Sequence, residues 1–440
     1  MPESDLKREL GLFDTTMMNV GGIIGSGIFL VPAVIATHLG GSGPILAAWL
    51  IGGIAALLGS LALAELGAAM PHAGGPVVYL NRAFGPVWGY LYGWSAAFVT
   101  NPAGIAAIAV AFATYLGFFI PLGETGVRFV AIAAIVALTA LNCFGIRLGA
   151  VTNNILSSGK LLALAAIVAG ALLLPGGSWD NVPPLWPAGV GLGAFGLAMV
   201  AVLWTYDGWI NLSYVAGEMR DPQRTLSRAA AWSVLLVTVL YLLVNAALMY
   251  VLPLARIAGR DLVLAEAVAV TAGSVGARLV AATIVLATLS ATHVTILACG
   301  RVSYAMAREG LFFEWAGKVH PRWRTPTPSL LAQGAVAVAF TASGTFNQLI
   351  TYVIFVSYVF FALSAAAVIK LRRTAPDMPR PYRTWGYPVT PVVFILFALG
   401  LVANTIVEAP REALIGAAIV LLGLPGYFFA RIGRARVAPA

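Results

Sequence analysis

The sequence predicts an all-α protein that crosses a membrane many times, and three observations support this. Hydrophobic residues make up 60% of the 440 residues and charged residues only 10%, whereas soluble proteins carry roughly 25% charged residues. Many apolar stretches reach the roughly 20 residues that a helix needs to cross a bilayer. Lys and Arg gather in alternate loops, a pattern that fixes orientation in membranes. A soluble enzyme, a coiled coil and a disordered chain are therefore excluded.

We expect twelve transmembrane helices that form a single transmembrane domain over residues 1–440. In chain order they cover 14–37, 43–69, 86–119, 125–145, 152–174, 192–217, 229–252, 277–307, 327–344, 347–370, 387–408 and 411–431. The loops between them are mostly short. Runs of Gly and Pro interrupt the helical pattern at 40–44, 175–177 and 326–328 and mark three of these loops.

The distribution of basic residues predicts that both termini lie in the cytoplasm of a cell whose plasma (inner) membrane holds the protein. Twenty of the 26 Lys and Arg residues, Arg431, Arg434 and Arg436 among them, then fall on the inner side, and five fall outside. Residues 1–10 are charged and lack an apolar core or cleavage site, so we expect no signal peptide. The same topology accounts for the net charge of +9, and binding to nucleic acid is not expected.

Cysteine and histidine usage argues against a disulfide framework, a metal site or any other cofactor. Cys143 and Cys299 both fall inside apolar segments, and the four histidines are scattered without ligand-pair spacing. His293 lies within a span, where a hydrogen bond to neighbouring backbone is favoured over a proton relay. Glu65, near the inner end of the second span, is expected to pair with a loop arginine. Lys160 and Asp207 are the other ionisable residues at membrane depth, and such residues are functional candidates.

The first span contains an unusual run of glycines, with Gly25, Ser26 and Gly27 at its middle. Glycine is a poor helix former, although small residues also permit close helix packing. An unwound turn here leaves free carbonyls at the end of one half-helix and free amides at the start of the next. Such a break offers acceptors for an ammonium and donors for a carboxylate, and hence a site for a zwitterion.

The sixth span carries a second candidate break, at Asp207 and Gly208. An Asp-Gly pair is a turn signal, and Asp is a preferred N-cap, so we expect Asp207 to cap the second half of the helix. Breaks in spans 1 and 6, five spans apart, are what a five-plus-five inverted repeat predicts.

Motifs at these places are similar to those of the amino acid–polyamine–organocation superfamily and, within it, of the L-type amino acid transporters. The similar segments are 22–29, 64–67, 71–76, 142–145, 160–162, 206–209, 217–219, 301, 307–311 and 325–326. The resemblance implies twelve helices in the LeuT-like fold. It places a first inverted repeat at about 14–174, a second at about 192–370, and helices 11 and 12 at about 387–431.

The resemblance also implies a site for an α-amino acid held largely by backbone. Amides near Ser26 and Gly27, next to Gly25, take the carboxylate, and the carbonyls of Ile23, Trp204 and Thr205 take the ammonium. Trp204 matches the aromatic residue that acts as a gate over bound substrate. Asp207 stands where many animal members have glycine, and Asn101 in span 3 is a further candidate for the pocket.

Lys160 matches a lysine that the family places where sodium carriers of the same fold hold a cation between helices 1, 5 and 8. An ammonium there supplies the positive charge that a sodium ion would supply. The alternative is that Lys160 reaches the membrane surface with its long side chain. The loop between spans 3 and 4 lacks the cysteine that animal members use to join a heavy subunit, so no covalent heavy subunit is expected.

The resemblance implies sodium-independent exchange of small or medium neutral L-amino acids by alternating access. Proton-coupled symport stays open as the alternative. A membrane enzyme is disfavoured because the Gly-x-Ser-Gly pattern at 40–43 stands in a loop of small residues. A channel is disfavoured because channels need a continuous polar pore lining. Polyamines and other purely cationic substrates are disfavoured, because the one buried carboxylate of Asp207 cannot balance the charge of a dibasic substrate.

Overall fold

The computed structural model describes residues 6–187, 189–260, 263–343 and 349–428. Over these residues the chain is helical with no β-strand, and the one element of strand pairing is an isolated parallel bridge between Leu10 and Met219. The all-α expectation is confirmed. The α-helices are α1 (Leu12–Ile23), α2 (Gly27–Leu39), α3 (Ser42–Ala69), α4 (Pro76–Phe84), α5 (Pro86–Ser95), α6 (Asn101–Leu116), α7 (Glu124–Cys143), α8 (Ile146–Leu173), α9 (Leu192–Tyr206), α10 (Asn211–Tyr214), α11 (Pro222–Val251), α12 (Leu254–Ile257), α13 (Val263–Arg308), α14 (Thr327–Ser343), α15 (Leu349–Thr374), α16 (Val389–Glu408) and α17 (Pro410–Leu421).

Short turns of other helix types connect several of these α-helices. A π-helical turn, η1 (Ala96–Thr100), joins α5 to α6, and a 3-10 turn, η3 (Asp207–Ile210), joins α9 to α10. The remaining 3-10 turns are η2 (Trp179–Asn181), η4 (Ala216–Glu218) and η5 (Glu314–Gly317).

The expected count of twelve spans is not reached within the described residues. Ten helices there are long and apolar enough to cross a membrane, and the bent pair α1 and α2 makes eleven. The ninth expected span, 327–344, corresponds to α14, which has 17 described residues. The ends of the ninth and twelfth expected spans, the start of the tenth, and Arg431, Arg434 and Arg436 lie outside the described residues.

The eighth span is longer than its expected range of 277–307. Helix α13 runs from Val263 to Arg308, and Gly273 interrupts it with a φ of 63°. Glycine tolerates this left-handed conformation without steric cost, so the helix turns at Gly273 before it enters the bundle.

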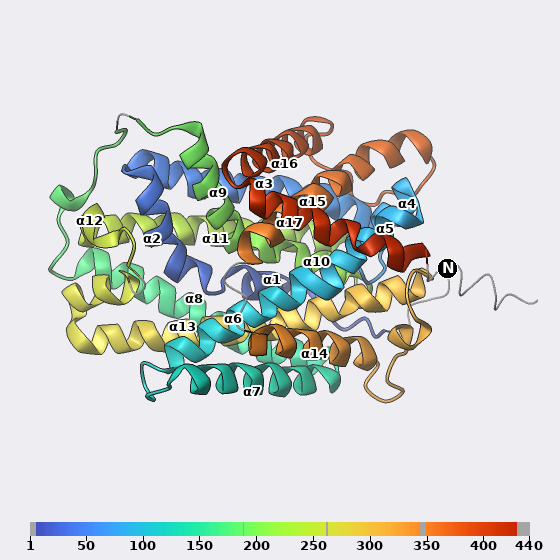
Figure 1. The fold of residues 1–440 in the computed structure, drawn as a ribbon, viewed down its shortest axis with the longest axis horizontal. Coiled ribbons are helices and arrows are strands. Elements are labelled where there is room, and N and C mark those ends of the chain that lie inside the picture. The colour runs from blue at the N-terminus through green and yellow to red at the C-terminus, as the bar shows by residue number, and fades with distance from the viewer. Residues whose placement is uncertain (1–5, 188, 261–262, 344–348, 429–440) are drawn as a thin grey trace, which may run out of the picture.

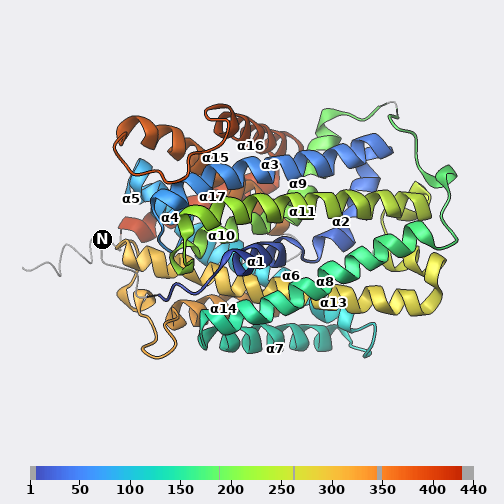
Figure 2. The same cartoon turned by 180° about the vertical axis from the view of Figure 1, so that it is seen from behind.

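The helices run roughly along the longest axis of the molecule, as Figures 1 and 2 show. Helices α7 and α14 pack together along one edge of the bundle, while α16 lies at the opposite edge against α3 and α15. The broken pair α1 and α2 runs between these edges, in contact with α8, α9, α11 and α13. The chain is thus a multi-pass membrane protein with its first helix enclosed.

Close helix packing fixes the position of α9 beside the first helix. At Gly52 of α3 an added Cβ would lie 2.5 Å from Val202, and at Gly53 it would overlap Thr238 of α11. Small residues of this kind let helix backbones approach closely in lipid. The backbone of α9 is therefore held by α3 on one side and by α2 on another.

Two of the ionisable residues at membrane depth have structural partners, as expected. Glu65 accepts hydrogen bonds from Arg372 Nε and Nη2 at 2.8 and 2.6 Å and from the Thr384 amide at 2.7 Å. The His293 Nε2 lies 2.9 Å from the Gly149 carbonyl oxygen, which assigns His293 to helix packing. Arg372 lies in the last turn of α15 rather than in a loop, and the loop arginine that pairs with Glu65 is Arg380, whose Nε lies 3.6 Å from Glu65 Oε1. The expected hydrogen bond of His293 to neighbouring backbone is confirmed.

The N-terminal segment closes one end of the bundle by pairing with the chain that follows the sixth span. The amides of Glu9 and Leu10 donate to the Glu218 carbonyl at 2.9 and 3.0 Å, and the Arg220 amide donates to the Leu10 carbonyl at 3.0 Å. In addition to this backbone pairing, the Glu218 carboxylate accepts hydrogen bonds from Arg301 Nε and Nη2 at 2.8 and 2.9 Å. Both side chains of this ion pair are almost fully buried.

Candidate functional site

The first span breaks where the glycines predicted it. Helix α1 ends at Ile23 and α2 begins at Gly27, with a bend of 43° between them. Among the described residues, the Ser26 and Gly27 amides donate no hydrogen bond to the backbone of the preceding turn. These amides stand at the positive end of α2, as a carboxylate site requires.

The carbonyls on the other side of this break face Lys160. The Lys160 Nζ donates to the carbonyl oxygens of Gly21 and Ile24 at 2.8 and 2.7 Å, and to Ser290 Oγ of α13 at 3.3 Å. The side chain is 0% exposed, so it does not reach the membrane surface. Lys160 of α8 therefore joins the first span to the eighth at the end of α1.

The sixth span is distorted rather than sharply bent. Helix α9 passes at Asp207 into the 3-10 turn η3, and α10 follows at Asn211. Asp207 makes no capping hydrogen bond, and its Oδ1 is buried without a partner among the described residues. The expectation that Asp207 caps the second half of the helix is therefore wrong, because the 3-10 turn continues the chain without a free first turn there.

The two breaks touch through backbone at Gly208. An added Cβ at this position would overlap the backbone of Gly22 and Ile23. Glycine is thus required for the close approach of the sixth span to the end of α1.

A tyrosine that sequence reasoning missed also joins the two breaks. The Tyr241 hydroxyl, on α11, lies 3.0 Å from the Ile23 carbonyl oxygen and 3.3 Å from that of Thr205. Both carbonyls were expected to accept from the substrate ammonium. The Ile23 carbonyl also accepts from the Gly25 amide at 3.0 Å, so both of its lone pairs are already used, because a carbonyl oxygen can accept two hydrogen bonds.

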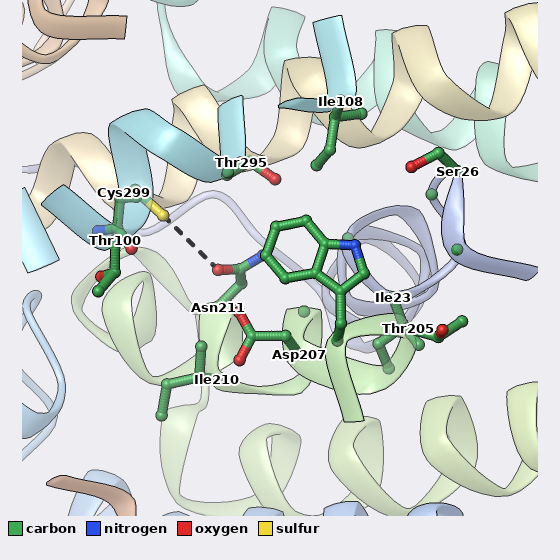
Figure 3. Close-up of a pocket in the computed structure, with 17 residues that line it drawn as sticks. Ile23, Ser26, Thr100, Ile108, Thr205, Asp207, Ile210, Asn211, Thr295 and Cys299 are labelled. Carbon is green, nitrogen blue, oxygen red and sulfur yellow. Dashed lines mark hydrogen bonds between the residues drawn. The ribbon is translucent and has the colours of Figure 1, made fainter. Parts of the chain in front are cut away.

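All eight predicted binding residues line one cavity of about 60 Å³ between the first, third, sixth and eighth spans. Figure 3 shows Ser26 on one side of it, Asp207 and Thr205 on another, and Thr295 opposite. The predicted members are Ile23, Gly25, Ser26, Gly27, Asn101, Trp204, Thr205 and Asp207. The structure places these residues around one cavity, and their roles in binding stay predictions.

The cavity has further walls that the sequence did not reveal. Thr100, Gly104 and Ile108 come from the third span, and Thr295 and Cys299 from the eighth. The Cys299 Sγ lies 3.8 Å from Asn211 Oδ1. Residues of this kind carry no local signal, since isolated small or apolar residues on a helix are more often packing residues.

A second, smaller cavity of about 20 Å³ adjoins the first. The two cavities share four lining residues, namely Thr100, Asn101, Asp207 and Ile210. Beyond these the second cavity reaches Ser357 and Phe360 of α15 and the Tyr92 and Tyr214 pair, whose hydroxyls are hydrogen-bonded to each other.

Comparison with known proteins agrees with this geometry. Residues 10–424 match the family described as amino acid permease. This chain belongs to that family. It is 32% identical over 436 residues to the serine/threonine exchanger SteT of Bacillus subtilis (strain 168), which covers 97% of both chains. The resemblance to amino acid transporters that the motifs indicated is thereby confirmed.

Two human proteins are similar to this permease at the same level. One is the b(0,+)-type amino acid transporter 1, 32% identical over 437 residues, which cover 97% of this chain and 88% of the human protein. The other is the large neutral amino acids transporter small subunit 2, 32% identical over 443 residues, 96% of this chain and 80% of the other. The three relatives differ in the substrates that their names give, so membership of the family leaves the substrate class open.

Proposed function

We propose that the chain is a sodium-independent exchanger of small neutral L-amino acids that works by alternating access. Lys160 carries the proposal, because its buried ammonium contacts the α1 carbonyls and the eighth span together. A cation held there by the protein replaces one that would otherwise come from solution, and it repels a second. The exchanger relative supports antiport rather than net uptake.

The size of the cavity supports a small substrate. A site needs roughly 10–15 Å³ of such volume for each water-sized group, so about 60 Å³ holds four to six of them. Alanine has six non-hydrogen atoms and fits this cavity, whereas serine and threonine have seven and eight and also need the adjoining cavity of about 20 Å³. An aromatic amino acid exceeds both cavities together. The amides of Ser26 and Gly27 bind the carboxylate, and the carbonyls of Ile23, Trp204 and Thr205 share the ammonium.

Trp204 acts as the gate over this site. Its ring lines the cavity, is partly buried, and lies near Gly104 of the third span. Movement of the ring away from the third span opens the cavity to the outside. The inverted repeats, 14–174 and 192–370, supply one broken helix each and rock around the site, with helices 11 and 12 (387–431) beside them.

The protein is proposed to lie in the plasma (inner) membrane with both termini in the cytoplasm and to need no heavy subunit, cofactor or metal. The segment between α6 and α7 has no cysteine with which to attach a second chain. In this orientation the N-terminal bridge to Glu218 closes the cytoplasmic end.

Counter-flow in proteoliposomes tests the proposal. Purified protein is reconstituted with internal unlabelled alanine, and uptake of labelled alanine is measured in sodium buffer and in choline buffer. We expect equal rates in both buffers, and a loss of at least 10-fold in turnover for Lys160→Met. Lys318→Met, on a loop residue outside the cavity, is the matched control and should retain the wild-type rate.

Two outcomes would overturn the proposal. A strict requirement for sodium would show that Lys160 does not replace a cation. Uphill accumulation driven by an imposed pH gradient in empty vesicles would establish proton symport, which is the second candidate because a buried lysine can exchange its proton.

A further inference from the structure

Two polar atoms stand without partners at the junction of the two cavities. Asp207 Oδ1 and Asn101 Nδ2 are both buried, and neither has a hydrogen-bond partner among the described residues. Both residues line the larger and the smaller cavity. They come from different spans, Asn101 from the start of α6 and Asp207 from the first residue of η3, directly after α9, so two spans contribute to the lining that the cavities share.

The chemistry of the two atoms is complementary. A carboxylate oxygen accepts hydrogen bonds, whereas an amide NH₂ donates them. A buried polar atom left unpaired costs roughly 1–3 kcal/mol, so a ligand group that satisfies both atoms is strongly favoured over one that satisfies neither. A hydroxyl does this with a single oxygen, because it donates one hydrogen bond and accepts others.

Other side-chain groups fit this junction less well. A methyl group satisfies neither atom, and an ammonium donates to Asp207 but offers no acceptor to Asn101. A carboxylate accepts from Asn101 but repels Asp207. An aromatic ring exceeds the smaller cavity, whose volume of about 20 Å³ holds one or two water-sized groups.

We propose that Asn101 and Asp207 recognise the side-chain hydroxyl of the substrate, and that serine and threonine are the preferred amino acids. The hydroxyl donates to Asp207 Oδ1 and accepts from Asn101 Nδ2. The methyl group of threonine enters the smaller cavity beside Phe360 and Val356. This inference rests on the proposed function, since it assumes that the backbone of the two breaks holds the α-amino acid group.

The test compares amino acids of equal shape with and without a hydroxyl. Serine is paired with 2-aminobutyrate and threonine with valine, and apparent affinities are measured by competition against labelled serine in proteoliposomes. We expect the wild type to prefer each hydroxyl compound at least 10-fold, since a site that hydrogen-bonds a hydroxyl rejects analogues that lack it. In Asn101→Leu and in Asp207→Leu, which remove one partner each, this ratio should fall toward 1.

Two controls keep the result interpretable. Ser364→Ala removes a hydroxyl of α15 that bonds to the Phe360 carbonyl and that lies outside both cavities, so the ratio should keep its wild-type value. Asp207→Asn preserves shape and one acceptor oxygen, so it should reduce the ratio less than Asp207→Leu does. Elution from a size-exclusion column identifies any variant that fails to fold.

A wild-type ratio near 1, or a wild-type ratio in both leucine variants, would overturn the inference. Equal loss of all substrates in Asp207→Asn with an unchanged ratio in Asn101→Leu would assign Asp207 to the α-ammonium instead. Failure of the proposed function looks different, because no amino acid would then exchange at all. Exchange of amino acids without hydroxyl preference would remove this inference alone.

Discussion

Replacement of Glu218 by glutamine should destabilise the protein far more than the same change at a surface glutamate. The Glu218 and Arg301 side chains are 0% and 1% exposed and form two charge-assisted hydrogen bonds. Glutamine keeps the shape of the side chain but leaves the Arg301 charge buried without its counter-ion. The amide group of glutamine also presents an NH₂ toward a guanidinium that has no acceptor.

The expected magnitude follows from burial. Removal of one partner of a buried ion pair costs about 3–5 kcal/mol, whereas an exposed pair contributes about 0.2–1 kcal/mol. Glu124 provides the matched comparison, because its pair with Arg128 has side chains 82% and 45% exposed. With an unfolding entropy of about 2.1 cal/mol/K per residue, Glu218→Gln should lower the Tm by about 3–5 °C and Glu124→Gln by less than about 1 °C.

The assay is thermal unfolding in detergent, followed by the loss of monodisperse protein on a size-exclusion column. The double variant Glu218→Leu with Arg301→Met removes both charges, and it should recover most of the lost stability, since paired replacement of a buried ion pair by apolar residues is often neutral. Equal Tm shifts for Glu218→Gln and Glu124→Gln would refute the reasoning, because burial would then have no energetic consequence at this pair.

Three further predictions concern the breaks and the cavity. Gly208→Ala should reduce exchange at least 10-fold, since its methyl group overlaps the α1 backbone, while Gly400→Ala, with open space around it, should not; equal rates would contradict this. In a Cys143→Ser background a thiol-reactive reagent should inhibit exchange through Cys299, and saturating substrate should slow the inhibition because Cys299 lines the cavity; inhibition at the same rate with substrate would place the thiol elsewhere. Tyr241→Phe removes the single hydroxyl donor that competes with a substrate ammonium for the Ile23 and Thr205 carbonyls; a hydrogen bond worth about 0.5–1.5 kcal/mol corresponds to a gain in apparent affinity of about 2- to 12-fold, and a weaker apparent affinity would show that the hydroxyl supports binding instead.

The breaks in the first and sixth spans could be predicted because they depend on local sequence. Four glycines in seven residues around Gly25, and the Asp207–Gly208 pair, disfavour a continuous helix wherever they stand. The two breaks are five spans apart, as in a five-plus-five inverted repeat, and this spacing predicted that they form one site. The same local reasoning failed for the cap at Asp207, because a 3-10 turn satisfies the backbone and leaves the carboxylate free.

The remaining walls of the site depend on packing between spans, which a single sequence does not encode locally. Nothing near Tyr241 in α11 or Thr295 in α13 distinguishes either residue from other polar residues in apolar helices. Gly27 is a residue whose local role was predicted from the sequence but whose packing was not. Its part in the break was predicted, but its contact with the sixth span was not: an added Cβ would lie 2.7 Å from Thr205 Oγ1, so a larger side chain there would displace Thr205.

The carbonyls at the end of α1 show how the protein divides its own hydrogen bonds from those left for a substrate. Lys160 holds the carbonyls of Gly21 and Ile24, which turn away from the cavity toward α8. The Ile23 carbonyl between them already accepts from Tyr241 and from the Gly25 amide at 3.0 Å, so an arriving ammonium must share or displace one of these donors. Tyr241 is the donor that can leave without unwinding the break further, because it belongs to another helix and also reaches Thr205. Substrate binding at Ile23 and Thr205 would therefore weaken the contact of α11, the seventh span, with both breaks at once. In this way occupancy of the site would change how tightly the seventh span is held.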